Sequence, residues 1–235
     1  MEAVGQPRQT AILCAFFDLE ATGLHVQHAE AIEIASVCRL VLPDGAWCHL
    51  AEPTDGRFRR LVQPRRAPSR FIQKLTGLSQ TQLKLEGGSF GEAMEAWTAW
   101  LQGAVDAAAA LVRGRGMEVE LWLVGHNALQ YDLPLLVSQH AREQSREARR
   151  ALGLHRIAHL FGGLRGLAGF ADTLRLSRAL ARAGGFRPPA HSLGALHGFV
   201  VGGAVPGAHT GIGDAEALAE VCVRGPLGGA LVGAV

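Results

Sequence analysis

The sequence predicts an α/β domain in which helices cover both faces of a central mixed five-stranded sheet. Short, nearly continuous apolar runs such as TAILCAFFDLE at residues 10–20 are typical of buried strands. These runs are separated by longer segments with the apolar spacing of amphipathic helices. A chain of 235 residues, 48% hydrophobic and 19% charged, is large enough to bury such a core as one domain.

Three strands and three helices are predicted in the first half of the chain. The predicted strands span residues 10–20, 30–42 and 57–64. The predicted helices span residues 69–79, 81–90 and 89–112. Between the second and third strands, the turn-rich residues 43–56 suit either a loop or a hairpin. Ser89 and Glu92 have the spacing of a capping box, so the long helix is expected to start at Ser89.

The second half continues the alternation of strands and helices. Its predicted strands span residues 119–127 and 167–172, and its predicted helices span residues 128–141, 172–183, 191–200 and 213–223. Asp172 is expected to cap the helix that it begins. Residues 141–165 are rich in Arg and Gly and are expected to form a helix end and a variable loop. The chain then divides into an N-terminal extension (1–10), one domain (11–224) and a Gly-rich tail (225–235).

The charge and cysteine patterns limit the class of protein. The net charge is only +2, but all except two of the 23 basic residues are arginine, and several of them cluster within residues 57–70. This cluster indicates either a nucleic-acid footprint or a coding bias towards arginine. The four cysteines show no zinc spacing, and no apolar stretch approaches the ~20 residues of a membrane span. We therefore expect a soluble intracellular protein, in the cytoplasm or nucleus, with no membrane partner.

Two carboxylates stand near the end of the first apolar run, in FFDLEATGL at residues 16–24. Side chains alternate along a strand, so Asp18 and Glu20 point to one side while Leu19 points to the other. Two such carboxylates repel each other unless a cation or a proton lies between them. Their oxygen ligands favour Mg²⁺ or Mn²⁺ over zinc. Alone, the pair more often marks a solvated strand end, so a metal site requires further carboxylates.

Two later segments supply them. Asp132 follows the apolar run at residues 119–127, where its alternative role is a helix N-cap ahead of Pro134. Asp214 opens a helix in AHTGIGDAEAL, and His209 lies five residues before it. Five helical steps would rotate the two side chains apart, so they face one site only if His209 lies on a loop. A loop histidine beside such a carboxylate is a candidate general base, whereas Asp214 alone would suit a cap.

Together, the segments FDLEATG, HNALQYD and HTGIGD resemble the three exonuclease motifs of the DEDDh group in the DnaQ-like, ribonuclease-H-like superfamily. A histidine separated by four residues from the last aspartate distinguishes this group from relatives that use tyrosine. The resemblance spans residues 11–222 and implies a ribonuclease-H-like fold and 3′→5′ exonuclease activity. FFDLEATGL, KLTGLS, VGHNALQYDLPLL and HSLGAL are most similar to the three-prime repair exonucleases of the TREX type. Gln130 and His191 depart from that pattern, at positions where arginine and tyrosine occur.

The resemblance implies a two-metal site. Two Mg²⁺ ions, roughly 3.5–4 Å apart in sites of this kind, would bridge the scissile phosphate, and Mn²⁺ is expected to substitute for them. Asp18 would contact both ions, with Glu20 and Asp214 completing one site and Asp132 holding the other. His209 would deprotonate the attacking water, and a 5′-mononucleotide would leave.

The resemblance also implies residues that hold a frayed DNA 3′ end. Leu24 and Leu75 are expected to wedge against the terminal bases, with core packing as the alternative. The other implied contacts are backbone approach at Ala21, Thr22 and Gly77, contact with the penultimate nucleotide by His126 and Asn127, and packing of Tyr131 beside the scissile phosphate.

The expected activity is release of 5′-mononucleotides from single-stranded DNA or frayed DNA 3′ ends. An exoribonuclease of the same fold is one alternative, since the 2′-OH is the group that discriminates RNA from DNA. A non-catalytic nucleic-acid-binding module is another, although such a clamp has no need of all five catalytic side chains. The process served, whether DNA repair, proofreading or nucleic-acid clearance, stays open. Residues 57–64 could form the edge strand of a homodimer, or their arginines could discourage such pairing.

Overall fold

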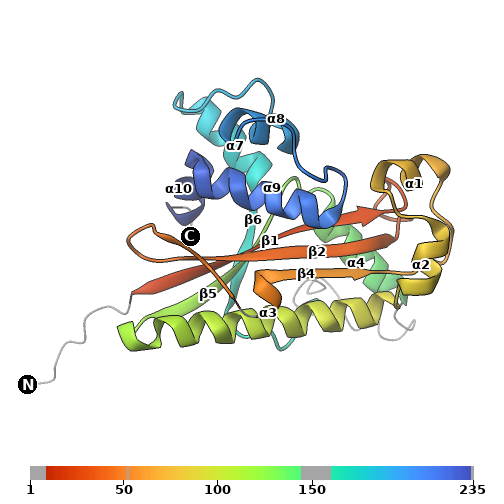
Figure 1. Ribbon diagram of the computed structural model, residues 1–235, viewed down its shortest axis with the longest axis horizontal. Helices are drawn as coiled ribbons and strands as arrows, with labels where there is room; N and C mark the ends of the chain where they lie inside the picture. The colour runs from red at the N-terminus through yellow and green to blue at the C-terminus, as the bar shows by residue number, and fades with distance from the viewer. Residues whose placement is uncertain (1–8, 52, 144–159, 234–235) are drawn as a thin grey trace, which may run out of the picture.

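A mixed six-stranded sheet lies at the centre of the computed structural model, which describes residues 9–51, 53–143 and 160–233 (Figure 1). The strands are β1 (Thr10–Ala21), β2 (Ala31–Val41), β3 (Trp47–His49), β4 (Arg57–Leu61), β5 (Glu118–Gly125) and β6 (Leu167–Asp172). The main strand order is β3-β2-β1-β5-β6, and β4 also pairs with β2. β1 is antiparallel to β2 but parallel to β5, and β5 is parallel to β6. The predicted mixed sheet is confirmed.

The sheet contains one strand more than the five predicted. β3 pairs with the end of β2, so that Val41 lies opposite Trp47, and the segment 43–56 begins as a hairpin, which was one of its two predicted forms. β3 is only three residues long, too short for its side chains to show a clear alternation in the sequence. β4 pairs with β2 farther along the same edge, and the prediction that this edge joins two copies of the chain stays a prediction.

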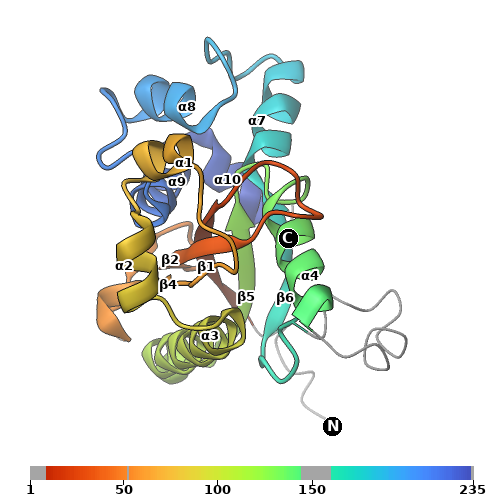
Figure 2. The same ribbon diagram turned by 90° about the vertical axis from the view of Figure 1, so that its right-hand side faces the viewer.

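Helices cover both faces of the sheet, as predicted (Figure 2). They are α1 (Arg70–Thr76), α2 (Gln80–Glu86), α3 (Phe90–Val112), α4 (Asp132–Glu143), α7 (Thr173–Arg182), α8 (Leu193–Val200), α9 (Gly211–Arg224) and α10 (Pro226–Gly233). α3 and α4 pack on one face, while α7, α8, α9 and α10 pack on the other. The capping box at Ser89 and the cap at Asp172 are both present. None of the helices in the described ranges combines the length and the apolar character needed to cross a bilayer.

The side chains of β1 show how the two layers are organised. One set packs towards α3 and α4 and comprises Ala11, Leu13, Ala15, Phe17 and Leu19. The other set includes Cys14 and Phe16, which pack with α9 and α10. Because the strand alternates, Asp18 and Glu20 fall on the α9 side, where the apolar cluster ends. The strand therefore directs both carboxylates towards the N-terminal end of α9.

The C-terminal segment differs from the predicted Gly-rich tail. Residues 226–233 form α10, which packs against α9 and α7 and buries Leu227 and Leu231. Pro226 is the first residue of the helix, a position where a backbone N–H would have no intrahelical acceptor, so its absence costs no hydrogen bond. The four glycines of residues 225–235 conceal the apolar spacing in the sequence. The predicted N-terminal extension and the variable part of residues 141–165 lie mostly outside the described residues.

Trp97 of α3 provides a test of the core beneath the carboxylates. It is fully buried, and its ring centroid lies 5.5 Å from that of Phe17 and 5.4 Å from that of Phe161. Trp97→Ala should lower the free energy of unfolding by about 3–5 kcal/mol, measured by urea denaturation, because it leaves a cavity under β1. Trp97→Phe is the control and should cost much less, since the indole Nε1 has no hydrogen-bond partner within the described residues. A loss below about 1 kcal/mol for Trp97→Ala would contradict this packing.

Candidate active site

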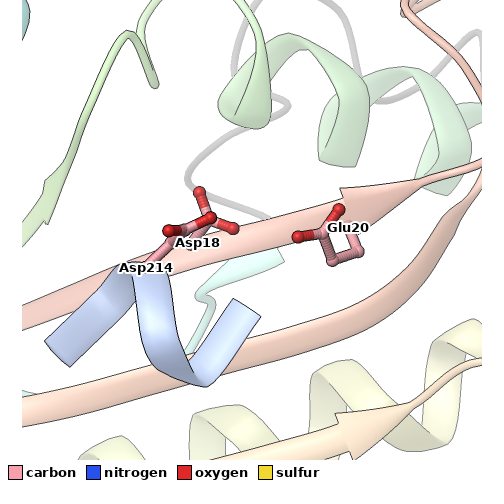
Figure 3. A group of neighbouring side chains, drawn as sticks. All are labelled: Asp18, Glu20 and Asp214. Carbon is pink, nitrogen blue, oxygen red and sulfur yellow. The ribbon is translucent and has the colours of Figure 1, made fainter. Parts of the chain in front are cut away.

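Three carboxylates meet where β1 passes the first turn of α9. One oxygen each of Asp18, Glu20 and Asp214 lies within 4.8 Å of the other two. Figure 3 shows that the two β1 side chains and the α9 side chain approach from different elements. All three are half-buried, so solvent still reaches the group. The structure therefore brings together three of the four carboxylates that the sequence predicts.

Asp132, the fourth predicted carboxylate, is the first residue of α4 and is 95% buried. Its charge is the largest electrostatic contribution to the raised pKa of Asp18, which indicates that the two carboxylates lie close together. Asp132 stands at a helix N-terminus, where backbone N–H groups favour a carboxylate. The predicted alternative was a helix N-cap, but Asp132 lies inside the first turn of α4, a position that is compatible with its predicted role in the metal site.

Burial raises the pKa values of all four side chains, and the charges of neighbouring carboxylates raise them further. Burial is the larger cause for Asp18, followed by the charges of Asp132, Glu20 and Asp214. Burial and neighbouring carboxylates raise the pKa of Glu20 from 4.5 to about 8, and burial raises the pKa of Asp132 from 3.8 to about 7. Burial also raises the pKa of Asp214, against a backbone N–H of His209 that lowers it. A hard divalent cation would relieve this repulsion, and these oxygen donors fit such an ion.

Two glycines of the HTGIGD segment allow α9 to reach the sheet. A Cβ at Gly211 would lie 3.0 Å from the Cβ of Ala35 and 3.4 Å from Cδ of Glu33, so a side chain there would require these neighbours to move by a few tenths of an ångström. A Cβ at Gly213 would lie 2.3 Å from the carbonyl oxygen of Gly207, inside the preceding turn. Thr210 caps the helix by accepting the Gly213 N–H. This close approach places Asp214 opposite Asp18.

Glu33 is a residue of the site that sequence reasoning missed. It lies on β2 directly opposite Glu20 and is fully buried. One of its carboxylate oxygens accepts the Nε–H of Arg59 on β4, and the other accepts the backbone N–H of Gly211 at 3.1 Å. Glu33 therefore ties β2, β4 and the start of α9 together. A buried acidic residue within the alternating segment EAIEIASV was the available signal.

His209 lies on the loop before α9, as the predicted role requires. Its side chain is exposed, and its backbone N–H donates to Oδ2 of Asp214 at 3.2 Å. Its φ of 63° is left-handed, an uncommon conformation for a residue with a side chain. Non-glycine residues held in this conformation are found preferentially at functional sites. The loop thus fixes the His209 backbone to a carboxylate of the site while leaving its ring accessible.

The HNALQYD segment is held by a second buried carboxylate that the sequence suggests only as a helix cap. Asp172 accepts the backbone N–H groups of Asn127 and Leu129 at 3.0 and 3.2 Å, while it also caps α7. Asn127 has a left-handed φ of 64°, which this anchoring stabilises. The ring of His126 lies 2.9 Å from Oγ1 of Thr173 through its Nδ1. Asp172 therefore fixes the turn that leads into Asp132.

The loop between β1 and β2 carries the predicted wedge residue Leu24, whose side chain is 84% exposed. The Tyr131 hydroxyl donates to the carbonyl oxygen of Gly23 at 2.6 Å. Arg142, at the other end of α4, donates to the carbonyl oxygens of Val26, Gln27 and Ala29. Core packing is thus excluded for Leu24. Arg142 is a second residue that sequence reasoning missed, because its partners lie more than 110 residues away.

The remaining predicted substrate residues lie at two places. Ala21 ends β1 with its side chain buried, and Thr22 exchanges hydrogen bonds with Glu30 through its N–H and its Oγ1. Leu75 and Gly77 lie on α1 and at its C-cap, and the Leu75 side chain is 39% exposed. These two are therefore not part of the carboxylate group. They belong to the helix that stands beside the β1–β2 loop (Figure 2).

Comparison with protein families adds an independent finding. Residues 15–114 match the RNase_T family model, described as Exonuclease. This part of the chain is less than half of its length and contains Asp18, Glu20 and Glu33. A search of the curated proteins by sequence found no match.

Solved structures of E. coli exonuclease I share the fold. The complex with a dA16 oligonucleotide has a TM-score of 0.58 at 14% identity, covering 92% of this chain and 40% of that chain. The zinc-bound complex with single-stranded DNA has a TM-score of 0.59 at 14% identity, covering 92% of this chain and 40% of that chain. A complex of exonuclease I with SSB-Ct has a TM-score of 0.58 at 15% identity, covering 96% of this chain and 44% of that chain. This chain thus spans about two fifths of the length of these relatives, and the similarity establishes the fold alone. The closer resemblance to TREX-type exonucleases stays a prediction.

The raised pKa values predict how pH affects stability without metal. Between the ordinary pKa of Glu20, 4.5, and its raised value of about 8, the folded protein holds a proton that the unfolded chain has lost. The free energy of unfolding should therefore fall as pH rises through this window. Mg²⁺ should raise Tm more near the upper end of the window than near the lower end, as measured by calorimetry. Glu20→Gln should flatten the pH dependence, and an equal effect of Mg²⁺ at both ends would contradict the assignment.

The contacts of Arg142 predict a change in local opening. Arg142→Ala removes the donors to the β1–β2 loop, so the amides of His28 and Ala29 should exchange with solvent on the order of 10-fold faster. Hydrogen–deuterium exchange followed by mass spectrometry measures this change. Arg115→Ala, at the far end of α3, is the matched control and should leave the loop unchanged. Unchanged exchange in Arg142→Ala would show that the loop is held by its other contacts.

Proposed function

We propose that this protein is a metal-dependent 3′→5′ exonuclease that releases 5′-mononucleotides from single-stranded DNA or frayed DNA 3′ ends. The observation that carries the proposal is the grouping of Asp18, Glu20 and Asp214. Asp132 lies close to Asp18, and the backbone of the exposed His209 donates to Asp214. The Exonuclease family match supports it, as does the shared fold of exonuclease I, which was crystallised with oligonucleotides.

The four carboxylates are the residues that would hold divalent cations. Asp18 would contact both of two Mg²⁺ ions, with Glu20 and Asp214 completing one site and Asp132 holding the other. The grouping of Asp18 with Glu20 and Asp214, and the effect of the Asp132 charge on the pKa of Asp18, support this arrangement. Such ions, when bound, stabilise charge on the phosphate oxygens and lower the pKa of a bound water. Mn²⁺ prefers the same oxygen donors and is expected to substitute.

His209 would act as the general base. A water oxygen would form a bond to phosphorus while the ring of His209 takes a proton from that water. The bond between phosphorus and the 3′ oxygen of the preceding nucleotide would break, and that oxygen would take a proton from solvent to become the new 3′-hydroxyl. Because the ring is exposed, it can return that proton to solvent after each turnover. The backbone hydrogen bond to Asp214 keeps the base beside the carboxylates.

The surrounding residues would hold the strand end. Leu24 and Leu75 offer exposed apolar side chains for the terminal bases, and Tyr131 is fixed by its hydrogen bond to Gly23. Burial and nearby carboxylates raise the pKa of Tyr131 to about 12, so its hydroxyl stays a donor. The other proposed contacts are the backbone of Ala21, Thr22 and Gly77, and the side chains of His126 and Asn127.

Product analysis tests the proposed function. With Mg²⁺, the purified protein should shorten a 3′-extended single strand one nucleotide at a time and release 5′-mononucleotides, and it should act more slowly on a blunt duplex. Asp18→Asn should abolish cleavage, because the central ligand is lost. A faster rate on the matched ribo-oligonucleotide would overturn the DNA assignment in favour of an exoribonuclease. Binding of the strand without cleavage would show a non-catalytic nucleic-acid-binding module instead.

A matched variant tests the role of His209. His209→Asn keeps a residue that tolerates left-handed φ but removes the base, so kcat should fall by roughly 10²–10⁴-fold. Binding of the oligonucleotide, measured by fluorescence anisotropy with Ca²⁺, should stay within about twofold of the wild type. A variant that keeps most of its kcat would refute the role as base.

A further inference from the structure

The outward face of α1 combines cationic and apolar side chains in an unusual way. The α1 surface comprises Arg65, Arg66, Arg70, Phe71, Lys74 and Leu75, all exposed. Phe71 is 71% exposed, and it shares a face of the helix with Leu75, four residues later. The opposite face of α1 is turned inward, where Ile72 packs against a buried cluster and Thr76 is buried. Packing therefore accounts for the inner face, whereas the side chains of the α1 surface are exposed to solvent.

Charge is distributed unevenly along the chain around this surface. Residues 57–85 contain eight basic side chains and no acidic one, although the whole chain carries only +2. The other residues therefore have 15 basic side chains against 21 acidic ones. Two arginines of this stretch have acidic partners: Arg57 pairs with Glu216 at the surface, and Arg59 pairs with the buried Glu33. The four cations of the α1 surface come later in the same stretch, and all are exposed. Exposed cations grouped in this way can bind a polyanion.

Hydrogen bonds connect the α1 surface to the carboxylate group. The backbone N–H groups of Arg65 and Arg66 donate to a carboxylate oxygen of Glu30 at 3.1 and 3.4 Å. The backbone of Glu30 exchanges hydrogen bonds with Thr22, two residues after Glu20. Figures 1 and 2 both show α1 beside the segment that follows β1. The α1 surface therefore lies beside the loop that follows the carboxylates of β1.

We propose that the α1 surface binds the nucleotides that precede the 3′ end of a single-stranded DNA substrate. The ring of Phe71 would stack on a base, and Arg65, Arg66 and Arg70 would contact phosphates. Proteins that bind single strands combine these two elements, because every base has a π-face and every nucleotide a phosphate. This inference rests on the proposed function, because it assigns to that site its binding of longer strands.

Binding measurements without turnover test the assignment directly. Fluorescence anisotropy, with Ca²⁺ in place of Mg²⁺, measures the affinity of each protein for a DNA trinucleotide and for a single-stranded DNA 12-mer. The proteins compared are the wild type, Phe71→Ala and the triple variant Arg65→Gln/Arg66→Gln/Arg70→Gln. Phe71→Ala should weaken binding of the 12-mer by about 10-fold, and Phe71→Trp should restore it. The triple variant should lower the slope of log affinity against log salt by about 2. Neither variant should change trinucleotide affinity by more than about twofold.

Control variants separate this surface from general effects of charge and folding. Arg113→Gln/Arg115→Gln removes two exposed cations at the opposite end of the molecule, where α3 ends (Figure 1). Leu111→Ala removes an apolar side chain that is 60% exposed at the same end. Both controls should bind the 12-mer as the wild type does. If they weaken it as much as the α1 variants do, or if the α1 variants weaken trinucleotide and 12-mer equally, the assignment is overturned.

The two proposals fail in different ways. If the wild type releases no mononucleotide with Mg²⁺, the proposed function fails, whatever the α1 variants do. If the wild type degrades the 12-mer and the α1 variants do so with unchanged kcat/KM, only the α1 surface is refuted. Support requires a loss of about 10-fold in kcat/KM on the 12-mer for Phe71→Ala, with kcat at saturating substrate unchanged.

Discussion

Repulsion among buried carboxylates is the constraint on which the rest of the structure depends. Asp18, Glu20, Asp132 and Asp214 converge at the end of β1, and the charge of Glu33 adds to the raised pKa of three of them. Water solvates them only in part, so each carboxylate disfavours ionisation of the others. The fold must hold these groups together against that repulsion, and it does so by building them into rigid elements: Asp18 and Glu20 into β1, Asp132 into α4 and Asp214 into α9. The free energy stored in this way is available to bind a divalent cation.

The backbone of α9 shows how the fold meets this constraint. Its first turn contacts β2 through Gly211, and a buried carboxylate from β2 accepts the N–H of that glycine. Glu33 thus satisfies one of the N–H groups that a helix start leaves without an intrahelical partner. Its other oxygen is neutralised by Arg59, a residue of the edge strand β4. Removing Arg59 would leave the charge of Glu33 buried without compensation, so this pair helps to fix the start of α9 and with it Asp214.

α4 links the carboxylates to the loop that would hold the strand end. The helix begins with Asp132 at the site and, within 12 residues, reaches Arg142 at the carbonyl groups of the β1–β2 loop. Tyr131, just before this helix, and Arg142, near its end, therefore both hold the loop that carries Leu24. Gln139 of the same helix accepts the Ala31 N–H at 2.7 Å and anchors the start of β2. The position of the carboxylates and that of the β1–β2 loop are therefore coupled through α4.

The sequence by itself determined the main strands and helices, the α/β class and the three carboxylates, Asp18, Glu20 and Asp214, that meet beside β1. Local rules suffice for these features: period-2 alternation put Asp18 and Glu20 on one face, and the capping box marked the start of α3. Only the tertiary structure decided the roles of Glu33, Asp172 and Arg142, whose partners lie 26 to 178 residues away along the chain. It also decided that residues 226–233 form a helix and that Phe71 is exposed. An isolated sequence segment does not show which of its faces another segment will cover, because burial depends on contacts made at long range.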